Sequence, residues 1–176
     1  MNRDRRIVIV GFMGCGKTSA AKHLARLLAC SMVDLDSFIT DREGRSPAEI
    51  IEHDGEDAFR KIETETLREV LADSSARVIA LGGGAWTIEA NRELVNRHDC
   101  VSVWLDTPFK LCWNRITSGN TNRPLAPDRS SAHRLYDSRR KSYEQAQLHV
   151  DINQHSKAHN TAATIIKKLE KVFEGT

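Results

Sequence analysis

One short glycine-rich segment near the start of the chain, Gly11 to Thr18, matches the pattern G-x-x-x-x-G-K-[ST] in full. In proteins this pattern forms a loop between a β-strand and a helix, and the backbone N–H groups of the loop surround phosphate. The flanking residues fit that context, because the unbroken β-branched run Ile7 to Val10 precedes the loop and a segment of helical period, Ser19 to Leu28, follows it. We therefore interpret the segment as a P-loop rather than a chance glycine-rich turn.

The loop predicts which residues bind a nucleotide. Its glycines let the backbone curl, and the helix that follows adds its positive amino-terminal end. Lys17 is expected to reach the β- and γ-phosphates of ATP, and the hydroxyl of Thr18 to bind Mg²⁺. The expected nucleotide-binding residues of the loop are Gly14, Cys15, Gly16, Lys17, Thr18 and Ser19. The motif leaves the reaction open, because GTPases, ATPases and several classes of kinase share it.

Short apolar runs alternate with segments of helical period along the rest of the chain. Further strands are expected at Met32 to Leu35, Val78 to Leu81, Cys100 to Leu105 and His149 to Ile152, and further helices at Ala58 to Leu71, at Glu89 to Asn96, from Thr107-Pro108 with Pro at the first helical position, and at the carboxyl terminus. Strands separated by helices imply right-handed crossovers. We therefore predict an α/β three-layer sandwich with a five-stranded parallel sheet, of the P-loop NTPase class, with ligands at the carboxyl ends of the strands.

The length of 176 residues fits a single domain, residues 1–176. A helical segment at about 36–72 is expected to bind the substrate. The segment from Ser118 to Ala132 is rich in Gly, Asn and Pro and is long for a connection in a compact domain. Because it also contains Arg123 and Arg129, we interpret the region at about 118–134 as a mobile lid that closes on phosphate.

The composition excludes several classes of function. With 26 basic and 24 acidic residues, the chain has no global field to attract nucleic acid or an anionic membrane. Only four apolar residues follow the charged start of the chain, so we expect no signal peptide or membrane span and a cytoplasmic location. The cysteines, which lack Cys-x-x-Cys or zinc spacing, are expected to be free thiols; they are Cys15, Cys30, Cys100 and Cys112.

Two carboxylates, Asp34 and Asp36, follow the second predicted strand. One of them can hold the Mg²⁺ shell, and the other can orient or deprotonate an acceptor hydroxyl. The alternative for Asp36 is that it only caps the next helix. Asp106, at the end of the fourth predicted strand, is a rival for the Mg²⁺ role on pattern alone.

Basic residues and glycines suggest a site for an anionic acceptor. Arg60 and Glu63 are three apart on a predicted helix and can pair, which would prepare Arg60 to bind a substrate carboxylate; the alternative is a solvated surface pair. The three glycines at 82–84 leave bare backbone where a ligand can approach, unless they only form a tight turn. Arg123 could stabilise transferring phosphate, and Arg139 and Arg140 begin the stretch that runs to Tyr143.

The ordered set of these motifs resembles shikimate kinase over most of the chain, from Ile7 to about Ile152. The set consists of the P-loop, Asp-x-Asp, Phe-Arg-x-x-Glu, Gly-Gly-Gly, Arg-Pro-Leu and a late Arg-x-x-x-Tyr. The resemblance implies ATP-dependent phosphorylation of the 3-hydroxyl of shikimate by a monomeric enzyme of the nucleoside monophosphate kinase-like fold, in the pathway to chorismate and aromatic amino acids.

The resemblance also implies residue roles. The implied catalytic residues are Asp36 as candidate base, Lys17 and Arg123; the implied substrate-binding residues are Asp36, Arg60, Glu63, Gly82, Gly83, Gly84 and Arg139; the implied metal residues are Thr18 and Asp34, the latter through water. Arg123 would also approach the nucleotide phosphates, and Arg115 and the segment from Asn153 to His155 would lie near adenine.

The sequence departs from the family pattern at two places. The family usually continues its late arginine as Arg-x-Pro-Leu-Tyr, whereas this chain has Lys141 and Ser142 in place of Pro and Leu, so Arg140 becomes a rival for the role of Arg139. Trp86 is bulkier than expected and could narrow the acceptor pocket or pack beneath it. The alternative functions are a kinase for gluconate or a nucleoside monophosphate, and a nucleotide-binding module without an acceptor.

Overall fold

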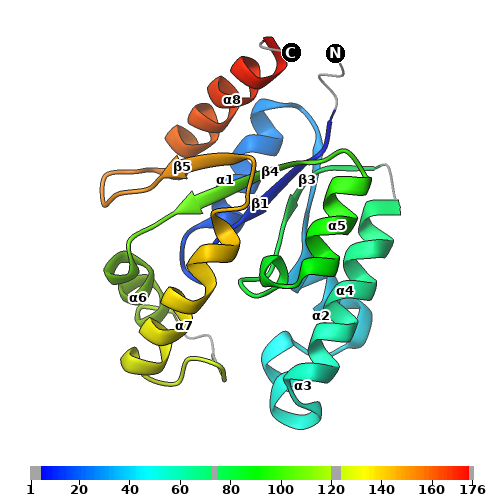
Figure 1. Ribbon diagram of the computed structural model, residues 1–176, viewed down its shortest axis with the longest axis vertical. Coiled ribbons are helices and arrows are strands. Elements are labelled where there is room, and N and C mark those ends of the chain that lie inside the picture. Colours follow the sequence, from blue (N-terminus) through cyan, green and yellow to red (C-terminus); the bar gives the residue numbers. More distant parts are fainter. Residues whose placement is uncertain (1–4, 73–74, 120–123, 175–176) are drawn as a thin grey trace.

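Five parallel strands form one sheet in the order β2-β3-β1-β4-β5 in the computed structural model, which describes residues 5–72, 75–119 and 124–174 (Figure 1). The strands are β1 (Ile7–Val10), β2 (Ser31–Asp34), β3 (Ala76–Ala80), β4 (Val101–Asp106) and β5 (Leu148–Asp151). The predicted five-stranded parallel sheet is confirmed.

The central strand is the apolar run before the P-loop. All four residues of β1 are buried, and Ile9 lies opposite Ala80 of β3 and Val103 of β4. A strand with neighbours on both edges and helices on both faces has no polar environment to meet, which is why its sequence is apolar without alternation.

Helices cover both faces of the sheet. They are α1 (Lys17–Leu27), α2 (Leu35–Glu43), α3 (Pro47–Asp54), α4 (Glu56–Ala72), the 3₁₀ helix η1 (Ala85–Thr87), α5 (Glu89–Arg97), α6 (Phe109–Thr117), α7 (Arg129–Tyr143) and α8 (Ala158–Glu174). Helices α1 and α8 pack together on one face, and α4 and α5 pack together on the other (Figure 1). Over the described ranges, no helix combines the length and the apolar character needed to span a bilayer.

The strand order places two functional loops side by side. The connection from β1 to β2 runs toward the β2 edge of the sheet, whereas the connection from β3 to β4 runs in the opposite direction, toward the β5 edge. Because both crossovers are right-handed, they lie on opposite faces of the sheet. Strands β1 and β3 are neighbours, and the backbone N–H of Leu81 donates to the carbonyl of Ile9 at 3.0 Å. The P-loop and the three glycines therefore leave the same end of adjacent strands, where ligands bind in such sheets.

Most of the predicted boundaries differ from the observed ones by one or two residues, and three of these differences concern residues near the ligand site. Helix α1 begins at Lys17 rather than Ser19, so the last residues of the P-loop motif already form its first turn. Leu35 is the first residue of α2 rather than the end of β2, and its side chain is fully buried. Pro108 takes the N-cap position of α6 rather than the first helical one, because its ψ of 139° is extended.

Three helices occupy the segment predicted to be helical at about 36–72. The side chain of Asp34 caps α2 by accepting a hydrogen bond from the backbone N–H of Ser37. A capping box between Ser46 and Glu49, with Pro47 in the first turn, begins α3. These caps fix short helices that their own hydrogen bonds would not stabilise alone, and they make α2 and α3 firm walls for the space beside the P-loop.

The region predicted as a lid ends in a helix. The side chain of Asp128 accepts from the backbone N–H of Ser131 and caps α7, which begins at Arg129, so residues 129–134 are helical rather than irregular. Just before it, Ala126 packs with Phe109 and Ala132 in a small apolar cluster separate from the main core. Residues 120–123 lie outside the described part of the chain.

The four cysteines are free, as predicted. Three of them, Cys15, Cys100 and Cys112, are buried. Burial raises the pKa of the Cys112 thiol to about 12, so it stays a neutral, apolar packing group.

Candidate active site

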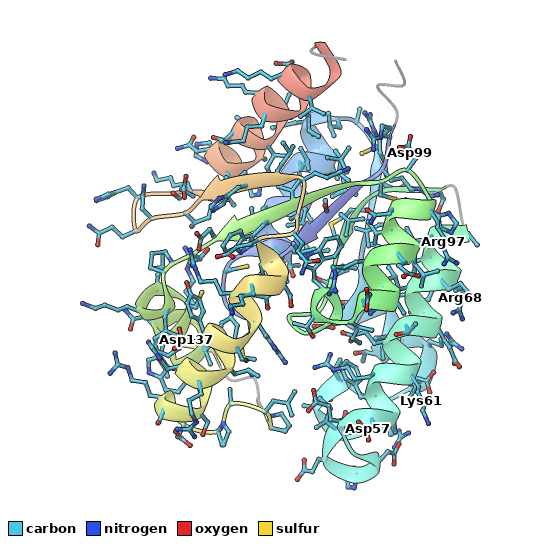
Figure 2. The ribbon with its side chains drawn as sticks, in the orientation of Figure 1. Asp57, Lys61, Arg68, Arg97, Asp99 and Asp137 are labelled. Carbon is cyan, nitrogen blue, oxygen red and sulfur yellow. The ribbon has the colours of Figure 1, made fainter. Side chains whose placement is uncertain are left out.

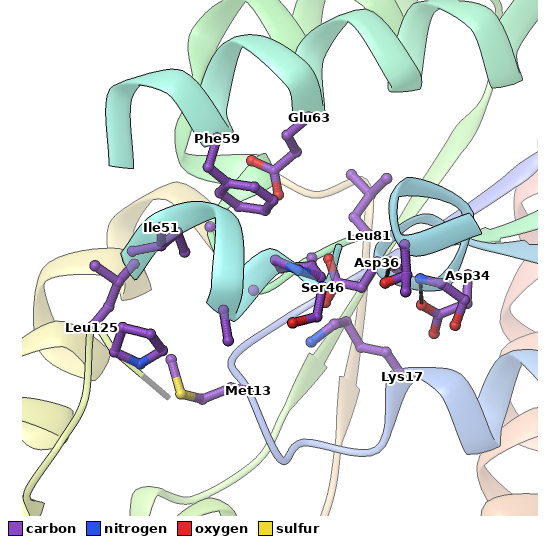
Figure 3. A pocket seen from close by; sticks show the side chains of 18 of the residues that line it. Met13, Lys17, Asp34, Asp36, Ser46, Ile51, Phe59, Glu63, Leu81 and Leu125 are labelled. Atoms are coloured by element: carbon purple, nitrogen blue, oxygen red, sulfur yellow. Dashed lines mark hydrogen bonds between the residues drawn. The ribbon is translucent and has the colours of Figure 1, made fainter. Parts of the chain in front are cut away.

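A cavity of about 770 Å³ opens at the carboxyl ends of β1, β2 and β3, beside the P-loop (Figure 3). Its walls come from the P-loop, α1, α2, α3, α4, the glycine segment and α7. The predicted site residues that line it are Gly14, Gly16, Lys17, Thr18, Ser19, Asp34, Asp36, Arg60, Glu63, Gly82, Gly83, Gly84 and Arg139. The structure thus brings together nearly all of the residues that the sequence motifs single out.

The P-loop adopts a conformation that requires glycine. Gly14 and Gly16 have φ angles of 74° and 101°, in the region that residues with a side chain rarely enter. A Cβ on Gly14 would also lie 2.7 Å from the carbonyl oxygen of Cys112. The ammonium of Lys17 folds over the loop and donates to the carbonyl oxygens of Gly11 and Phe12, at 2.8 and 3.0 Å.

Arg115 supports the loop from behind. Its Nη1 donates to the carbonyl oxygens of Gly14 and Cys15, both at 3.2 Å, and the hydroxyl of Thr107 also donates to Cys15 at 3.3 Å. These contacts hold the loop carbonyls toward α6 and the end of β4. Arg115 is not among the residues that line the cavity, and its predicted place beside the adenine stays a prediction.

Thr18 and Asp34 form a pair at the mouth of the cavity. The hydroxyl of Thr18 donates to Oδ2 of Asp34 at 2.5 Å, while Oδ1 of Asp34 accepts from the backbone of Ser37 at 3.2 Å. A hydroxyl and a carboxylate oxygen beside a phosphate loop are the hard oxygen ligands that suit Mg²⁺. The donor set therefore fits the metal.

Asp36 lies in the first turn of α2, and its side chain lines the cavity close to Lys17 and Asp34 (Figure 3). The alternative that Asp36 merely caps α2 is wrong, because Asp34 is the capping residue. Asp36 is therefore not the N-cap but the second residue of α2, and its side chain faces the space where an acceptor would lie.

Arg60 is held by two carboxylates on its own helix. Its Nη1 donates to Oε2 of Glu63 at 2.6 Å and its Nη2 to Oε1 of Glu56 at 2.9 Å. The side chain of Arg60 is 16% exposed and that of Glu63 is fully buried, so the alternative of a solvated surface pair is wrong. The pairing preorganises the guanidinium at the cavity wall.

Burial dominates the acidity of Glu63. It raises the pKa of this carboxyl to about 6, although Arg60 opposes the rise; the charge of Asp36 adds to it. Oε1 of Glu63 has no hydrogen-bond partner in the described part of the chain. A buried acceptor oxygen at a cavity wall is suited to receive a hydroxyl donor from a ligand.

Each of the three glycines makes room for a different part of the site. A Cβ on Gly82 would lie 2.6 Å from Oε1 of Glu63 and 2.7 Å from Oδ1 of Asp36, and a Cβ on Gly84 would lie 2.2 Å from Nη2 of Arg60. A Cβ on Gly83 would approach the backbone of Met13 at 3.2 Å. The triple glycine is therefore more than a tight turn, since every position admits a neighbouring group.

Consecutive arginines on α7 point to different places. Arg139 is 6% exposed and lines the cavity, and burial, together with the nearby charge of Arg60, lowers its pKa. Arg140 instead forms a two-pronged salt bridge with Asp106, with both N···O distances 2.8 Å. This geometry favours Arg139 over its rival for the acceptor role, and it leaves Asp106 paired outside the cavity.

The departures from the family pattern leave the site intact. Helix α7 runs without interruption through Lys141 and Ser142 to Tyr143. Trp86 is 2% exposed and is not among the cavity-lining residues, so it packs beneath the pocket rather than narrowing it. Arg123 lies outside the described residues.

Part of the cavity wall is apolar, and none of its side chains was predicted to face a ligand, although Phe59, Pro124 and Leu125 belong to the motifs of the resemblance. It consists of Met13, Ile51, Phe59, Leu81, Pro124 and Leu125 (Figure 3). Apolar side chains carry no signal that distinguishes a ligand-facing position from a core position, which is why the sequence assigns them no role in binding.

Comparison with known proteins gives one consistent family. The family model described as shikimate kinase matches residues 13–170. A shikimate kinase of Ruegeria pomeroyi is 38% identical over 149 residues, covering 83% of this chain and 75% of the relative. A shikimate kinase of Synechococcus elongatus is 35% identical over 173 residues, covering 97% of this chain and 89% of the relative.

Solved structures agree with the sequence comparison. Shikimate kinase from Acinetobacter baumannii, in complex with shikimate, superimposes with a TM-score of 0.88 at 33% identity, covering 95% of this chain and 93% of that one. The likeness therefore extends over nearly the whole of both chains.

Proposed function

This chain belongs to the shikimate kinase family, and from that premise we propose that it transfers the γ-phosphoryl group of ATP to the 3-hydroxyl of shikimate, with the residue roles described below. The reaction is a step toward chorismate and the aromatic amino acids. The observation that carries the proposal is the convergence of Asp36, Arg60, Glu63 and Arg139, from three different helices, on one cavity next to the P-loop.

The acceptor half of the cavity matches shikimate in charge and in hydrogen bonding. Shikimate has one carboxylate and three hydroxyl groups. The guanidinium groups of Arg60 and Arg139 are suited to the carboxylate, because two planar donors can bind it with charge-assisted hydrogen bonds. The carboxylate oxygens of Asp36 and Glu63 that approach Gly82 can accept hydrogen bonds from the hydroxyls. The apolar wall accommodates the faces of the ring.

The nucleotide half performs the transfer. The backbone N–H groups of the P-loop and the amino-terminal end of α1 bind the phosphates, and Lys17 moves its ammonium from the loop carbonyls to the β- and γ-phosphates. Thr18 would hold Mg²⁺, with Asp34 orienting it through water; the bound ion neutralises charge on the transferring phosphate. Asp36 orients the acceptor hydroxyl and takes its proton.

The remaining predicted roles extend this assignment. The region at about 118–134 would act as a lid, since Pro124 and Leu125 already form part of the cavity wall, and Arg123 would approach the phosphates from it. Arg115 would act on the nucleotide through the loop that it supports. We propose, as the family resemblance implies, that the enzyme acts as a monomer.

The experiment is to measure ADP release with ATP and Mg²⁺ in the presence of shikimate, gluconate or a nucleoside monophosphate. We expect turnover with shikimate at least about 100-fold faster than with the other acceptors. Shikimate has a rigid ring that can present its carboxylate to both arginines and its hydroxyls to both carboxylates while the ring lies on the apolar wall, whereas gluconate is an open chain and a nucleoside monophosphate has no carboxylate. Preference for another acceptor would replace the substrate assignment. Slow hydrolysis that no acceptor stimulates would indicate a nucleotide-binding module instead.

A further inference from the structure

The end of β4 carries a network of charges just outside the cavity. Asp106, the last residue of β4, is 13% exposed on its side chain and accepts two hydrogen bonds from Arg140, each 2.8 Å long. The guanidinium of Arg140 also lies over the ring of Trp104, 5.0 Å from its centroid, and Nε2 of His149 lies 3.0 Å from Oδ2 of Asp106. A bidentate pair packed on an indole ring has one favoured geometry rather than many.

This network fixes one side of helix α7. Consecutive residues on a helix are about 100° apart around its axis, so Arg139 and Arg140 leave α7 in different directions. One reaches the cavity, and the other reaches β4. Tyr143, one turn after Arg139, donates its hydroxyl hydrogen bond to the carbonyl of Gly83. The last turns of α7 are therefore attached at two points, to the ends of β4 and β3.

Arg139 depends on that attachment more than Arg60 depends on its own surroundings. Two carboxylates hold Arg60 directly. Within the described ranges no salt bridge holds Arg139, and its partner there is the hydroxyl of Tyr143. Burial and the like charge of Arg60 both oppose the charge of Arg139. A buried guanidinium that no carboxylate holds directly among the described residues needs a backbone that cannot rotate away from the cavity.

We propose that Asp106 and Arg140 form a positioning pair, which fixes the rotation of α7 about its axis and so aims Arg139 at the carboxylate of the acceptor. The inference rests on the proposed function, in which Arg139 binds that carboxylate. Neither member of the pair touches the substrate; each acts through Arg139. In this way a residue at the end of β4, which does not contact the substrate, influences how the acceptor is recognised.

The same network accounts for a cluster of three potential metal ligands outside the cavity, namely Asp106, His149 and Asp151. The guanidinium of Arg140 already occupies both oxygens of Asp106. A cation at this place would have to displace a bidentate positive partner, so we assign the cluster to positioning and not to metal binding.

The test compares Arg140→Met, which removes the charge and keeps the stem, and Arg140→Lys, which keeps the charge and loses the two-pronged geometry. Wild-type turnover with shikimate, measured first, tests the proposed function separately. Given that turnover, we expect Arg140→Met to raise KM for shikimate about 10-fold and to leave KM for ATP unchanged. The KM of Arg140→Lys for shikimate should lie between those of wild type and Arg140→Met. Asp106→Asn should change the two KM values in the same way as Arg140→Met.

The decisive measurement combines Arg140→Met with Arg139→Ala. If the pair acts through Arg139, adding Arg140→Met to Arg139→Ala should cause no further loss of kcat/KM for shikimate, because Arg139 is already absent. A purely structural role would lower Tm without changing KM in the folded variant, or would multiply the loss in the double variant; either result overturns the proposal. Asp137→Asn is the matched control, because Asp137 is 60% exposed on α7 and pairs only locally with His133 among the described residues (Figure 2). It should match wild type in both constants.

Discussion

The carboxylate of Glu63 lies 2.6 Å from the guanidinium of Arg60, with the acid fully buried and the base 16% exposed. Both residues lie on α4 and line the cavity, so Glu63 both holds Arg60 in place and forms part of the site. Because its pKa is raised to about 6, Glu63 changes charge near neutral pH, where activity and stability are measured.

Glu63 should make stability depend on pH. Its folded pKa, about 6, exceeds the ordinary value of 4.5, so the folded state binds more protons than the unfolded state between these values. The contribution of Glu63 is thus complete below about pH 4.5 and is lost as pH rises through about 6, a loss of about 2 kcal/mol. Urea unfolding of wild type and Glu63→Gln between pH 4 and 7.5 measures it, with the exposed Glu65→Gln on the same helix as control. Identical pH profiles for wild type and Glu63→Gln would contradict the prediction.

Asp36→Asn should lower kcat about 100-fold or more, because the amide keeps the size of the side chain and cannot take the hydroxyl proton. Binding of ATP and Mg²⁺ should change little, since Thr18 and Asp34 remain. Steady-state kinetics and nucleotide titration separate the two effects. Asp41→Asn, an exposed position on the same helix, should resemble wild type. If nucleotide affinity collapses in Asp36→Asn and the acceptor is unaffected, the roles of Asp34 and Asp36 are reversed.

Lys17→Ala should abolish turnover and leave the fold intact, because the ammonium of Lys17 contacts only the loop itself and the cavity. Circular dichroism and thermal unfolding check the fold, and ADP release checks the reaction. Lys22→Ala, at an exposed position of the same helix, is the control. Near-normal activity in a folded Lys17→Ala protein is incompatible with the P-loop assignment.

Arg60→Ala and Arg139→Ala should each lower kcat/KM for shikimate by about 10- to 100-fold, which corresponds to charge-assisted hydrogen bonds of about 1.5–3 kcal/mol. A shikimate analogue with a neutral carboxamide tests the cause. Wild type should discriminate strongly against the analogue, and the double variant should scarcely distinguish the two compounds.

The control for these two arginines is Arg97→Ala, since Arg97 is 74% exposed on α5 and is not among the cavity-lining residues (Figure 2). It should keep the full discrimination of wild type. If discrimination survives in the Arg60, Arg139 double variant, the carboxylate is held elsewhere and shikimate loses its main support as substrate.

Gly84→Ala should impair acceptor binding and spare the nucleotide. The added methyl would lie 2.2 Å from Nη2 of Arg60 and would force the guanidinium away from its place. We expect KM for shikimate to rise about 10-fold or more with KM for ATP unchanged. Gly44→Ala is the comparison: its φ of 67° makes a side chain strained, but the methyl meets nothing within 4 Å. It should lower Tm and leave both KM values alone; equal kinetic effects in the two variants would count against the steric explanation.

Much of this site could be predicted from the sequence, because its motifs are local. The P-loop carries its own context of strand and helix, and the spacing of Arg60 and Glu63 suffices to predict a pair on one helical face. The parallel sheet followed from buried apolar runs such as β1. Each of these inferences needs only residues that are close together in the chain.

The parts that could not be predicted depend on distant partners. Nothing local to Arg140 indicates that it pairs with Asp106, which is 34 positions away. Gly82 and Gly84 are explained only by the side chains of Asp36, Glu63 and Arg60 that approach them, and Gly83 by the backbone of Met13 in the P-loop. All of these neighbours are distant in sequence. Helix α2 begins at Leu35 because Asp34 caps it, although the apolar run before it favours a longer strand.

The hydrogen bond from Tyr143 to Gly83 joins residues that are 60 positions apart, and this matters while the chain is being synthesised. A nascent chain that ends before α7 already contains the P-loop, the aspartates and the glycines. It lacks Arg139 and the contact that seats α7 against β3. Because synthesis adds only about 5–20 residues per second, the chain exists for some seconds with its nucleotide residues made and its acceptor site incomplete. A prematurely released fragment would therefore carry Arg60 but not Arg139, only one of the two arginines for the acceptor's carboxylate. Translation itself would thus separate the appearance of ATP-binding residues from that of a competent kinase.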